Sequence, residues 1–345
     1  MQRDIIGQVY PWQQQVWENL TGRFPKMGHG LLFYGKQGCG KDAFAQQFVA
    51  WILCHQRDVQ SQPCGECSSC QWLKSDTHPN YVYISTDEEN KKQNAKIKIE
   101  KIRDLLPFVQ QTVDGWRVVV IEPAEALNIA SSNALLKTLE EPGDRIVIIL
   151  LADHYLKLPA TIRSRLQHFA LDRIDTAQAA AYLQQHLPDL DANKQQLLMN
   201  LSNQMPLQAL QLAQAEWLEQ RTDFIKDWYK LVTQKNMPMA IATKWNKALS
   251  FTDFSQMFEY LLCDLICVKL NQSIKNLDLS TALQHLAEQY DLESLFGLYA
   301  ELQQAKPMLE QNVQSNLVLD QLCIKLMLCT RQISQNPYPI RILLS

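Results

Sequence analysis

The sequence predicts an α/β domain built around a phosphate-binding loop, followed by a part of the chain that is helical throughout. Three observations support this fold class: a Gly-rich loop between an apolar run and a helical pattern, further apolar runs of strand length, and helical periodicity from residue 175 onward. The chain has 345 residues, 46% hydrophobic and 20% charged, which is enough for two or three domains with sizeable cores. This composition also excludes global disorder.

The Gly-rich loop spans residues 35–42 and follows the pattern G-x-x-x-x-G-K-[ST] at every constrained position but the last. Residues 31–34 form the apolar run expected for the preceding buried strand, and residues 42–53 have the apolar spacing of the helix that follows. In such a loop, backbone N–H groups and the helix N-terminus hold phosphate. The residues that the motif assigns to nucleotide binding are Gly35, Gly38, Gly40 and Lys41.

The last position of the motif is Asp42, where a Ser or Thr hydroxyl would hold Mg²⁺. Its carboxylate brings negative charge toward a bound triphosphate, and it can pair with Lys41. A simpler interpretation is an acidic residue that stabilises the N-terminus of its helix. The sequence therefore predicts that the loop keeps its fold and that hydrolysis is disfavoured, and it leaves ATP binding open.

Four of the nine cysteines are grouped in the spacing C-x9-C-x2-C-x2-C. The first closes the helix after the loop, and the other three lie on a polar insert in which Gly65 suits a tight turn. In a reducing compartment, this grouping favours a closed tetrahedral Zn²⁺ site with a structural role. An iron–sulfur cluster is one alternative, because C-x2-C-x2-C also occurs in ferredoxins, and four independent thiols are the other. The predicted ligands are Cys54, Cys64, Cys67 and Cys70.

A second apolar run, over residues 117–122, ends in Glu122. A P-loop protein that hydrolyses nucleotide places an Asp here to hold Mg²⁺, often followed by Glu. Pro123 removes that second acid, so a second metal-related position is altered. The further elements expected in this part of the chain are a helix over residues 133–141, a strand over 145–151 and a short helix over 159–165.

Together these segments resemble the bacterial sliding-clamp loader subunits of the AAA+ class. The likeness is carried by residues 133–142, residues 158–165 and the cysteine insert, and it is detailed over about residues 7–170. The domains that it implies are an AAA+ P-loop base domain with the zinc insert (1–170), a small helical lid (171–214) and an all-α collar (215–345), which would hold a ring of subunits together. Breaks between collar helices are expected at residues 236–238 and 251–253.

The resemblance implies a role for Arg165. In this family a Ser-Arg-Cys sequence ends the base domain, and its arginine points into the ATP site of a neighbouring subunit. Ser164 and Arg165 match this sequence, and Leu166 replaces the cysteine. A guanidinium stabilises charge that develops on the γ-phosphate, so Arg165 is the predicted arginine finger acting in trans. The alternatives are a surface charge and a salt-bridge partner.

The resemblance also implies departures around the chain's own nucleotide. The residue that senses the γ-phosphate falls at Ala152–Asp153, and Leu207 stands where the lid arginine would be. With Asp42 and Glu122, these departures predict a non-motor, stationary subunit of the DNA polymerase III clamp loader. Such a subunit supports ATP-dependent loading of the sliding clamp onto primed DNA without hydrolysing ATP itself. Its expected partners are the ATPase (gamma/tau) subunit and the delta subunit, with clamp and DNA contacted mainly through the complex.

Two other functions are weighed against this one. A motor ATPase of the gamma/tau type with an altered magnesium site is the alternative, because Lys41 and Glu122 are present. A zinc-dependent nucleic-acid binder is disfavoured, because the net charge is −3 and aromatic and basic residues do not alternate around the cysteines. No apolar run has the ~18 residues that a membrane helix needs, and the N-terminus lacks a secretory segment, so a cytoplasmic location is expected.

Overall fold

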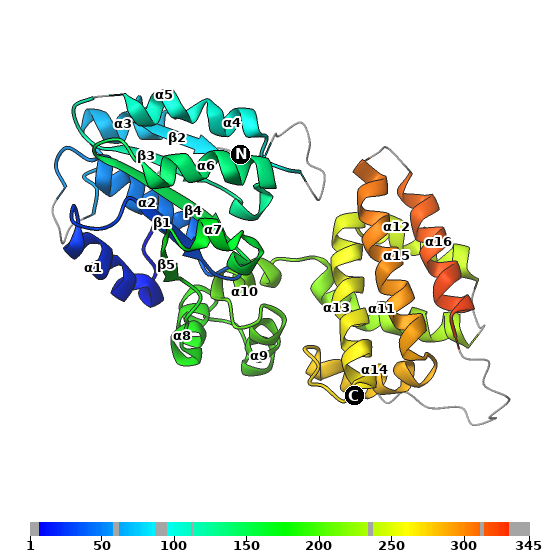
Figure 1. The fold of residues 1–345 in the computed structure, drawn as a ribbon. Helices are drawn as coiled ribbons and strands as arrows, with labels where there is room; N and C mark the ends of the chain where they lie inside the picture. The colour runs from blue at the N-terminus through cyan, green and yellow to red at the C-terminus, as the bar shows by residue number, and fades with distance from the viewer. Residues whose placement is uncertain are drawn as a thin grey trace. The chain divides into compact units, whose positions relative to one another are not determined.

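The computed structural model of the chain describes residues 7–57, 62–86, 95–111, 113–233, 237–310 and 314–330. The chain divides into two compact units (Figure 1). The first unit comprises Met1–Gln185 and Met205–Gln208, and the second comprises His186–Gln204 and Ala209–Ser345. The division into base, lid and collar at residues 170 and 214 stays a prediction.

The first unit is built on a parallel sheet of five strands in the order β2-β3-β4-β1-β5. The two strands beside β1 are β4 and β5, and β1 pairs in register with both, as in Leu31↔Ile149 and Leu31↔Gln167. Every residue of β3 and β4 is buried, as expected for parallel strands that are covered on both faces. The strands are β1 (Gly30–Tyr34), β2 (Tyr81–Ile84), β3 (Arg117–Ile121), β4 (Ile146–Ala152) and β5 (Gln167–Ala170).

Helices cover both faces of this sheet, because successive strand residues point to opposite sides. In β1, Leu31 and Phe33 belong to one apolar cluster and Leu32 to the other. The first cluster includes side chains of α1, α2 and α3, and the second includes side chains of α4, α5, α6 and α7 (Figure 1). The helices are α1 (Gln14–Arg23), α2 (Lys41–Leu53), α3 (Ser68–Lys74), α4 (Ile99–Arg103), α5 (Leu105–Gln110), α6 (Ile129–Glu140), α7 (Ala160–Arg163) and α8 (Thr176–His186).

The order of the strands positions the candidate site. Strands β3, β4 and β1 are neighbours, and all of them run in the same direction. Their carboxyl ends carry Glu122, Asp153 and the Gly-rich loop, respectively. Because ligands of open α/β sheets bind at this edge, the fold gathers these residues where a nucleotide would lie.

The described residues of the second unit form helices and the connections between them. Its core contains Phe224 and Trp228 of α11, Trp245 of α12, Phe258 of α13, and Tyr290. The Trp228 indole N–H donates to the Tyr290 hydroxyl (2.8 Å), and that hydroxyl donates to the carbonyl of residue 326 (2.6 Å), so buried polar atoms link three segments. The remaining helices are α9 (Ala192–Leu201), α10 (Pro206–Ala213), α11 (Trp217–Val232), α12 (Pro238–Ala248), α13 (Phe251–Lys269), α14 (Ser280–Glu288), α15 (Leu292–Glu310) and α16 (Ser315–Leu328).

One expected break in this unit is wrong. Residues 251–253 are not a connection but the first turn of α13. The chain leaves α12 at Leu249, and Ser250 is the N-cap, whose side chain accepts a hydrogen bond from the backbone N–H of Asp253 (3.1 Å). The Ser-x-x-Asp sequence therefore marks the start of a helix.

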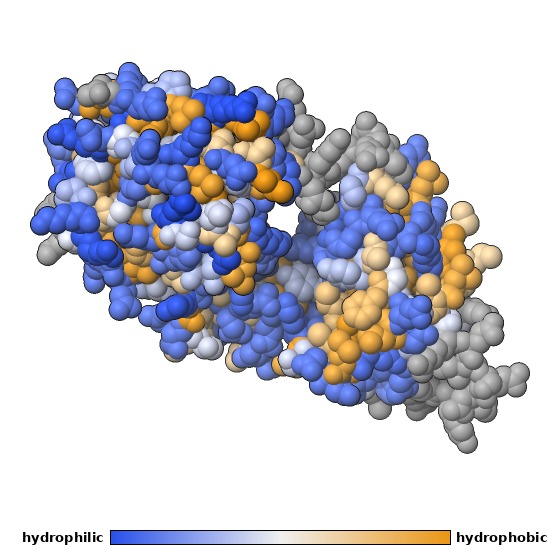
Figure 2. All heavy atoms as spheres, viewed as in Figure 1, coloured by the Kyte–Doolittle hydropathy of each residue, from blue (hydrophilic) through white to orange (hydrophobic). Residues whose placement is uncertain are grey.

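The surface of the second unit carries large apolar side chains on α15 and α16. Figure 2 shows hydrophobic residues at the surface of this unit, where Leu328 is 69% exposed, Leu317 60% and Phe296 50%. Apolar groups gathered on a surface are typical of an interface with another protein. Within the described residues, no helix is both long enough and apolar enough to cross a lipid bilayer.

Candidate functional site

The Gly-rich loop has the fold that its sequence predicts. Strand β1 ends at Tyr34, the loop follows, and α2 begins at Lys41. Gly38 and Gly40 have φ values of 84° and 85°, in the left-handed region that favours glycine. The backbone N–H of Gly35 donates to the carbonyl of Ala152 (3.1 Å), which joins the start of the loop to the end of β4.

The chain itself packs against the glycines of this loop. A side chain at Gly38 would meet the backbone N and Cβ of Gln208 at 2.7 and 2.5 Å, and one at Gly40 would meet ring atoms of Tyr10 at 2.5 Å. The backbone N–H of Leu207 also donates to the carbonyl of Gly38 (3.3 Å). Packing of the chain therefore already explains the need for both glycines, with no ligand invoked.

Lys41, the motif lysine, is held by acidic residues of the same unit. Its side chain is 10% exposed, and its Nζ lies 2.5 Å from Oδ1 of Asp153 and 3.9 Å from Oδ1 of Asp42. Burial lowers the pKa of Lys41, but the two carboxylates outweigh this effect and raise the pKa overall. Lys41 is therefore charged and already paired at the position where it would meet a phosphate.

Glu122 adds a third carboxyl group to this edge of the sheet. The hydroxyl of Tyr83 donates to its Oε2 (2.5 Å). Burial and the neighbouring Asp42 raise the pKa of Glu122 to about 8. Asp42, Glu122 and Asp153 thus lie around a single lysine. Because Glu122 is mostly protonated at pH 7, the negative charge that opposes a triphosphate comes from Asp42 and Asp153.

Arg165 lies at the end of the segment that follows α7, and its side chain is 36% exposed. Its Nη2 is 2.5 Å from Oε1 of Glu140, and its Nη1 donates to the carbonyl of Thr161 (2.7 Å). Arg165 is therefore a salt-bridge partner within its own unit, the alternative to the arginine finger, and its predicted role in trans stays a prediction. The other arginine of the segment, Arg163, instead lies 6.0 Å from the ring centroid of Tyr155.

The four grouped cysteines come together in space. The Sγ atoms of Cys54, Cys64, Cys67 and Cys70 all lie within 4.8 Å of one another. The Sγ of Cys64 is 3.5 Å from that of Cys54 and 3.9 Å from that of Cys70. Four thiolates around one ion at a Zn–S distance of about 2.3 Å lie about 3.8 Å apart, so this arrangement fits a tetrahedral metal centre.

Backbone N–H groups support the thiolate form of Cys64, whereas burial raises the pKa of Cys54 and Cys70. The N–H of Cys64 donates to the Sγ of Cys54, and the N–H of Cys67 donates to the Sγ of Cys64, each over 3.4 Å. Hydrogen bonds from the backbone of Glu66 and Cys67 lower the pKa of the Cys64 thiol. Since the thiolate is the form that binds a metal, the local backbone favours ligation.

His78 joins the cysteine insert to the sheet, a contact that the sequence did not reveal. Its Nδ1 accepts from the backbone N–H of Asn80 (3.0 Å), so Nε2 carries the proton and donates to the Ser69 hydroxyl (2.8 Å). That hydroxyl donates in turn to the carbonyl of Leu53 (2.6 Å). Burial lowers the pKa of His78 to about 4, so the ring is neutral at pH 7. The chain of bonds ties the insert to the end of α2 and the start of β2.

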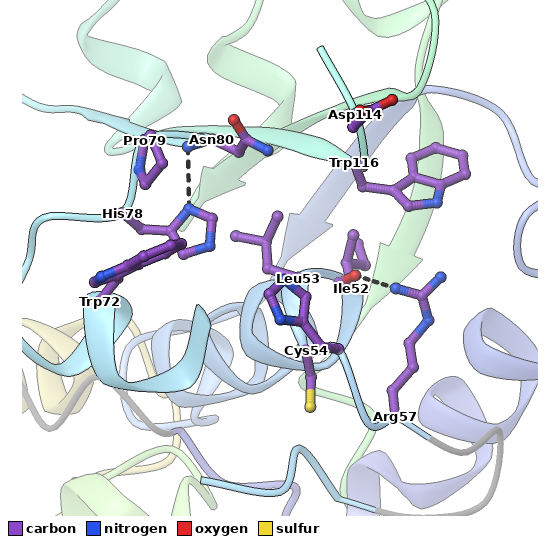
Figure 3. A pocket seen from close by; sticks show the side chains of 12 residues that line it. Ile52, Leu53, Cys54, Arg57, Trp72, His78, Pro79, Asn80, Asp114 and Trp116 are labelled. Carbon is purple, nitrogen blue, oxygen red and sulfur yellow. Dashed lines mark hydrogen bonds between the residues drawn. The ribbon is translucent and has the colours of Figure 1, made fainter. Parts of the chain in front are cut away.

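A cavity of about 520 Å³ lies beside this junction. Figure 3 shows Trp72 and His78 on one side of it and Trp116 and Arg57 on the other, with Leu53 between them. The guanidinium of Arg57 contacts the aromatic rings of Phe24 and Trp51 and donates to the carbonyl of Ile52. The walls of the cavity come from the end of α2, from the insert and from the segments that precede β2 and β3.

Comparison with known proteins identifies the family. Family models for the DNA polymerase III delta subunit and for its C-terminal part match residues 12–175 and 215–328, respectively. The DNA polymerase III subunit delta' of Pseudomonas aeruginosa is 38% identical over 243 residues, which cover 70% of this chain and 72% of the relative. The chain belongs to the DNA polymerase III delta' family. The delta' subunit of Haemophilus influenzae is 29% identical over 319 residues, covering 90% of this chain and 91% of its own length.

Relatives of another kind match less of the chain. The tau subunit of Bacillus subtilis DNA polymerase III is 35% identical over 178 residues, which cover 51% of this chain and 30% of the tau subunit. The predicted resemblance and the α/β fold with a helical second part are therefore confirmed. The two delta' subunits named above match 70% and 90% of this chain, and the tau subunit matches 51%. The roles assigned to Arg165, to the loop glycines with Lys41, and to the cysteines stay predictions.

Proposed function

We propose that this chain is the non-motor subunit of a DNA polymerase III clamp loader, which supports ATP-dependent loading of the sliding clamp onto primed DNA. The observation that carries this proposal is the pairing of the motif lysine with a carboxylate of the same chain. Lys41 is paired with Asp153, and two more carboxyl groups lie at the same edge. The lysine that the motif assigns to the β- and γ-phosphates is thus already neutralised within the chain, which supports the proposal that this chain does not turn over ATP on its own.

The catalytic contribution of the chain is made to a neighbour. Arg165 is partly exposed, and its contacts among the described residues leave several guanidinium N–H groups without a partner. A guanidinium placed against the γ-phosphate of an adjacent ATPase subunit stabilises the charge of the transition state, and arginine fingers contribute about 10³-fold or more to hydrolysis. Arg165 is thus proposed to complete a site that lies on another chain.

The proposed neighbours are the gamma/tau ATPase subunit and the delta subunit, joined in a ring through the helical second part. The exposed apolar side chains of α15 and α16 support a contact of this kind. A net charge of −3 supports contact with DNA and clamp mainly through the complex rather than through this chain alone. A cytoplasmic location follows from this role.

The cysteine insert is proposed to hold one structural Zn²⁺ through Cys54, Cys64, Cys67 and Cys70. Three of the Sγ–Sγ distances are 3.5–3.9 Å and all four Sγ atoms lie within 4.8 Å of one another, which suits a single ion. In a [4Fe–4S] cluster the thiolates bind separate irons and stand farther apart. Four protein ligands leave no open position, so the metal stabilises the fold and takes no part in chemistry. Metal analysis of the purified protein should give one zinc per chain, without visible absorption.

The alternative is an active motor ATPase of the gamma/tau type. Lys41 and the partial matches to tau subunits favour it. Steady-state phosphate release by the purified chain, with and without primed DNA and clamp, separates the two functions. The non-motor proposal requires no DNA-stimulated turnover, and turnover by this chain alone would overturn it.

A further inference from the structure

We propose that Glu140 is a positioning residue for Arg165. It holds the guanidinium, before any partner binds, in an orientation that can be offered to a neighbouring subunit. This inference rests on the proposed function of Arg165 in trans and adds a second residue to it. The Glu140 carboxylate itself would not touch the neighbour's nucleotide.

The contacts of Arg165 show how it is held. Its Nη2 lies 2.5 Å from Oε1 of Glu140 in an ion pair, and its Nη1 donates a hydrogen bond to the carbonyl oxygen of Thr161 over 2.7 Å. Two separate nitrogens are therefore fixed from two elements, α6 and α7, which pack against each other in the first unit (Figure 1). A planar guanidinium fixed at two points has a defined plane, and three of its five N–H groups remain to donate hydrogen bonds to a group of the neighbouring subunit.

Glu140 occupies a place where its charge does not help its own helix. It is the last residue of α6, and a carboxylate near a helix C-terminus faces the negative end of the helix dipole. Among the described residues, the ion pair with Arg165 is the interaction that its side chain makes. The next residue, Glu141, is also exposed and makes no side-chain contact of this kind in the described structure. Pairing with Arg165 is therefore what distinguishes the two adjacent glutamates.

The ion pair orients the arginine side chain but is weak enough for the arginine to exchange its partner. The side chains of Arg165 and Glu140 are 36% and 49% exposed, respectively. Exposed ion pairs contribute little to stability, so a phosphate of the neighbour can replace the carboxylate at small cost. Until then the pair limits the conformations of a long, flexible side chain, and such preorganisation of a charge that stabilises a transition state speeds the chemical step.

The experiment uses the reconstituted complex of this chain with its ATPase and delta partners, assayed for steady-state ATP hydrolysis with primed DNA and clamp. The variants are Glu140→Gln, Arg165→Ala and the double variant, with Glu141→Gln as the matched control for loss of one negative charge. We expect Glu140→Gln to lower kcat by about two- to fivefold with little change in KM for ATP. Glu141→Gln should behave as wild type, and Glu140→Gln should have no further effect once Arg165 is replaced.

Unchanged or faster hydrolysis with Glu140→Gln, in a complex in which Arg165→Ala slows hydrolysis, overturns the positioning role and leaves the proposed function standing. An equal loss in the wild-type and Arg165→Ala backgrounds also overturns it, because Glu140 would then act without Arg165. Unchanged hydrolysis with Arg165→Ala defeats the proposed function itself. Thermal unfolding of the isolated variants, which we expect to match wild type because both side chains are exposed, separates these effects from loss of fold.

Discussion

The ammonium nitrogen of Lys41 lies 2.5 Å from a carboxylate oxygen of Asp153, at the junction of α2 and the carboxyl end of β4. This contact places an anion of the chain itself on the lysine that the motif assigns to nucleotide phosphates. Strand β4 pairs directly with β1, so the fold requires the residue after β4 to lie near the loop after β1. A nucleotide that binds at this loop would therefore have to compete with Asp153 for Lys41.

Replacing Asp153 with Asn should free Lys41 and raise the affinity for nucleotide. Removing a carboxylate that competes with phosphate for one buried lysine should tighten binding of a fluorescent ATP analogue by roughly tenfold or more. Equilibrium titration of that analogue into wild type and Asp153→Asn measures the change. Asp76→Asn removes an exposed carboxylate at the end of α3 and serves as the control with unchanged affinity. Equal affinity of wild type and Asp153→Asn would show that the ion pair does not close the site.

Glu122 should make the stability of the protein depend on pH. Its pKa is raised from the usual 4.5 of a glutamate to about 8 in the folded protein, so between these values the folded state binds a proton that the unfolded state has lost. This contribution to stability is therefore present at low pH and is lost as pH rises through this window. Glu122→Gln should raise the thermal midpoint at pH 9 more than at pH 5 and flatten the profile. Parallel profiles for the two proteins would contradict the assignment.

Removing one cysteine of the insert should release the metal and weaken the first unit. Cys67→Ser should reduce bound zinc from one per chain to almost none and lower the thermal midpoint by roughly 10 °C, because metal binding contributes directly to folding. Cys267→Ser, which changes a partly buried thiol of α13, is the control and should retain the metal. Below the melting temperature, ATP hydrolysis by the assembled complex should be the same for Cys67→Ser and wild type. A lower rate there would mean that the insert has more than a structural role.

His78→Ala should destabilise the first unit by about 1–3 kcal/mol. The change leaves the buried hydroxyl of Ser69 and the backbone N–H of Asn80 without the imidazole that now bridges them. Chemical unfolding measures the loss, with His154→Ala as the control, because His154 is exposed. A stability equal to wild type would show that the insert is held to the sheet by other contacts.

The central strands could be predicted from the sequence to within about one residue. Strands β3 and β4 are buried on both faces, so they appear as continuous runs of Val, Ile and Leu. The edge strands β2 and β5 were not predicted, because they are four residues long and only partly buried. The predicted break at residues 251–253 is wrong for a local reason, since Ser250 caps α13 and the helix begins directly after it.

The candidate site was predicted residue by residue but not as a set of contacts. The motif identified Lys41 and the resemblance identified Arg165, but neither gave Asp153 or Glu140 as their partners, since those pairings depend on strand order and helix packing. The role of His78 does not follow from the sequence for a similar reason, because it depends on Ser69 of the insert and on the backbone N–H of Asn80, just before β2. The His-Pro-Asn sequence just before β2 is the feature that points to His78, but it does not show that the imidazole lies beside Ser69.

ATP hydrolysis by the reconstituted complex, compared between wild type and Arg165→Ala, tests the central claim most directly. Arg173→Ala is the matched control, because it removes an exposed arginine of the same unit. Size-exclusion chromatography should show that all three proteins assemble equally with their partners. We expect Arg165→Ala to lower hydrolysis by roughly tenfold or more and Arg173→Ala to leave it unchanged. Wild-type turnover by an intact complex that carries Arg165→Ala would contradict the account.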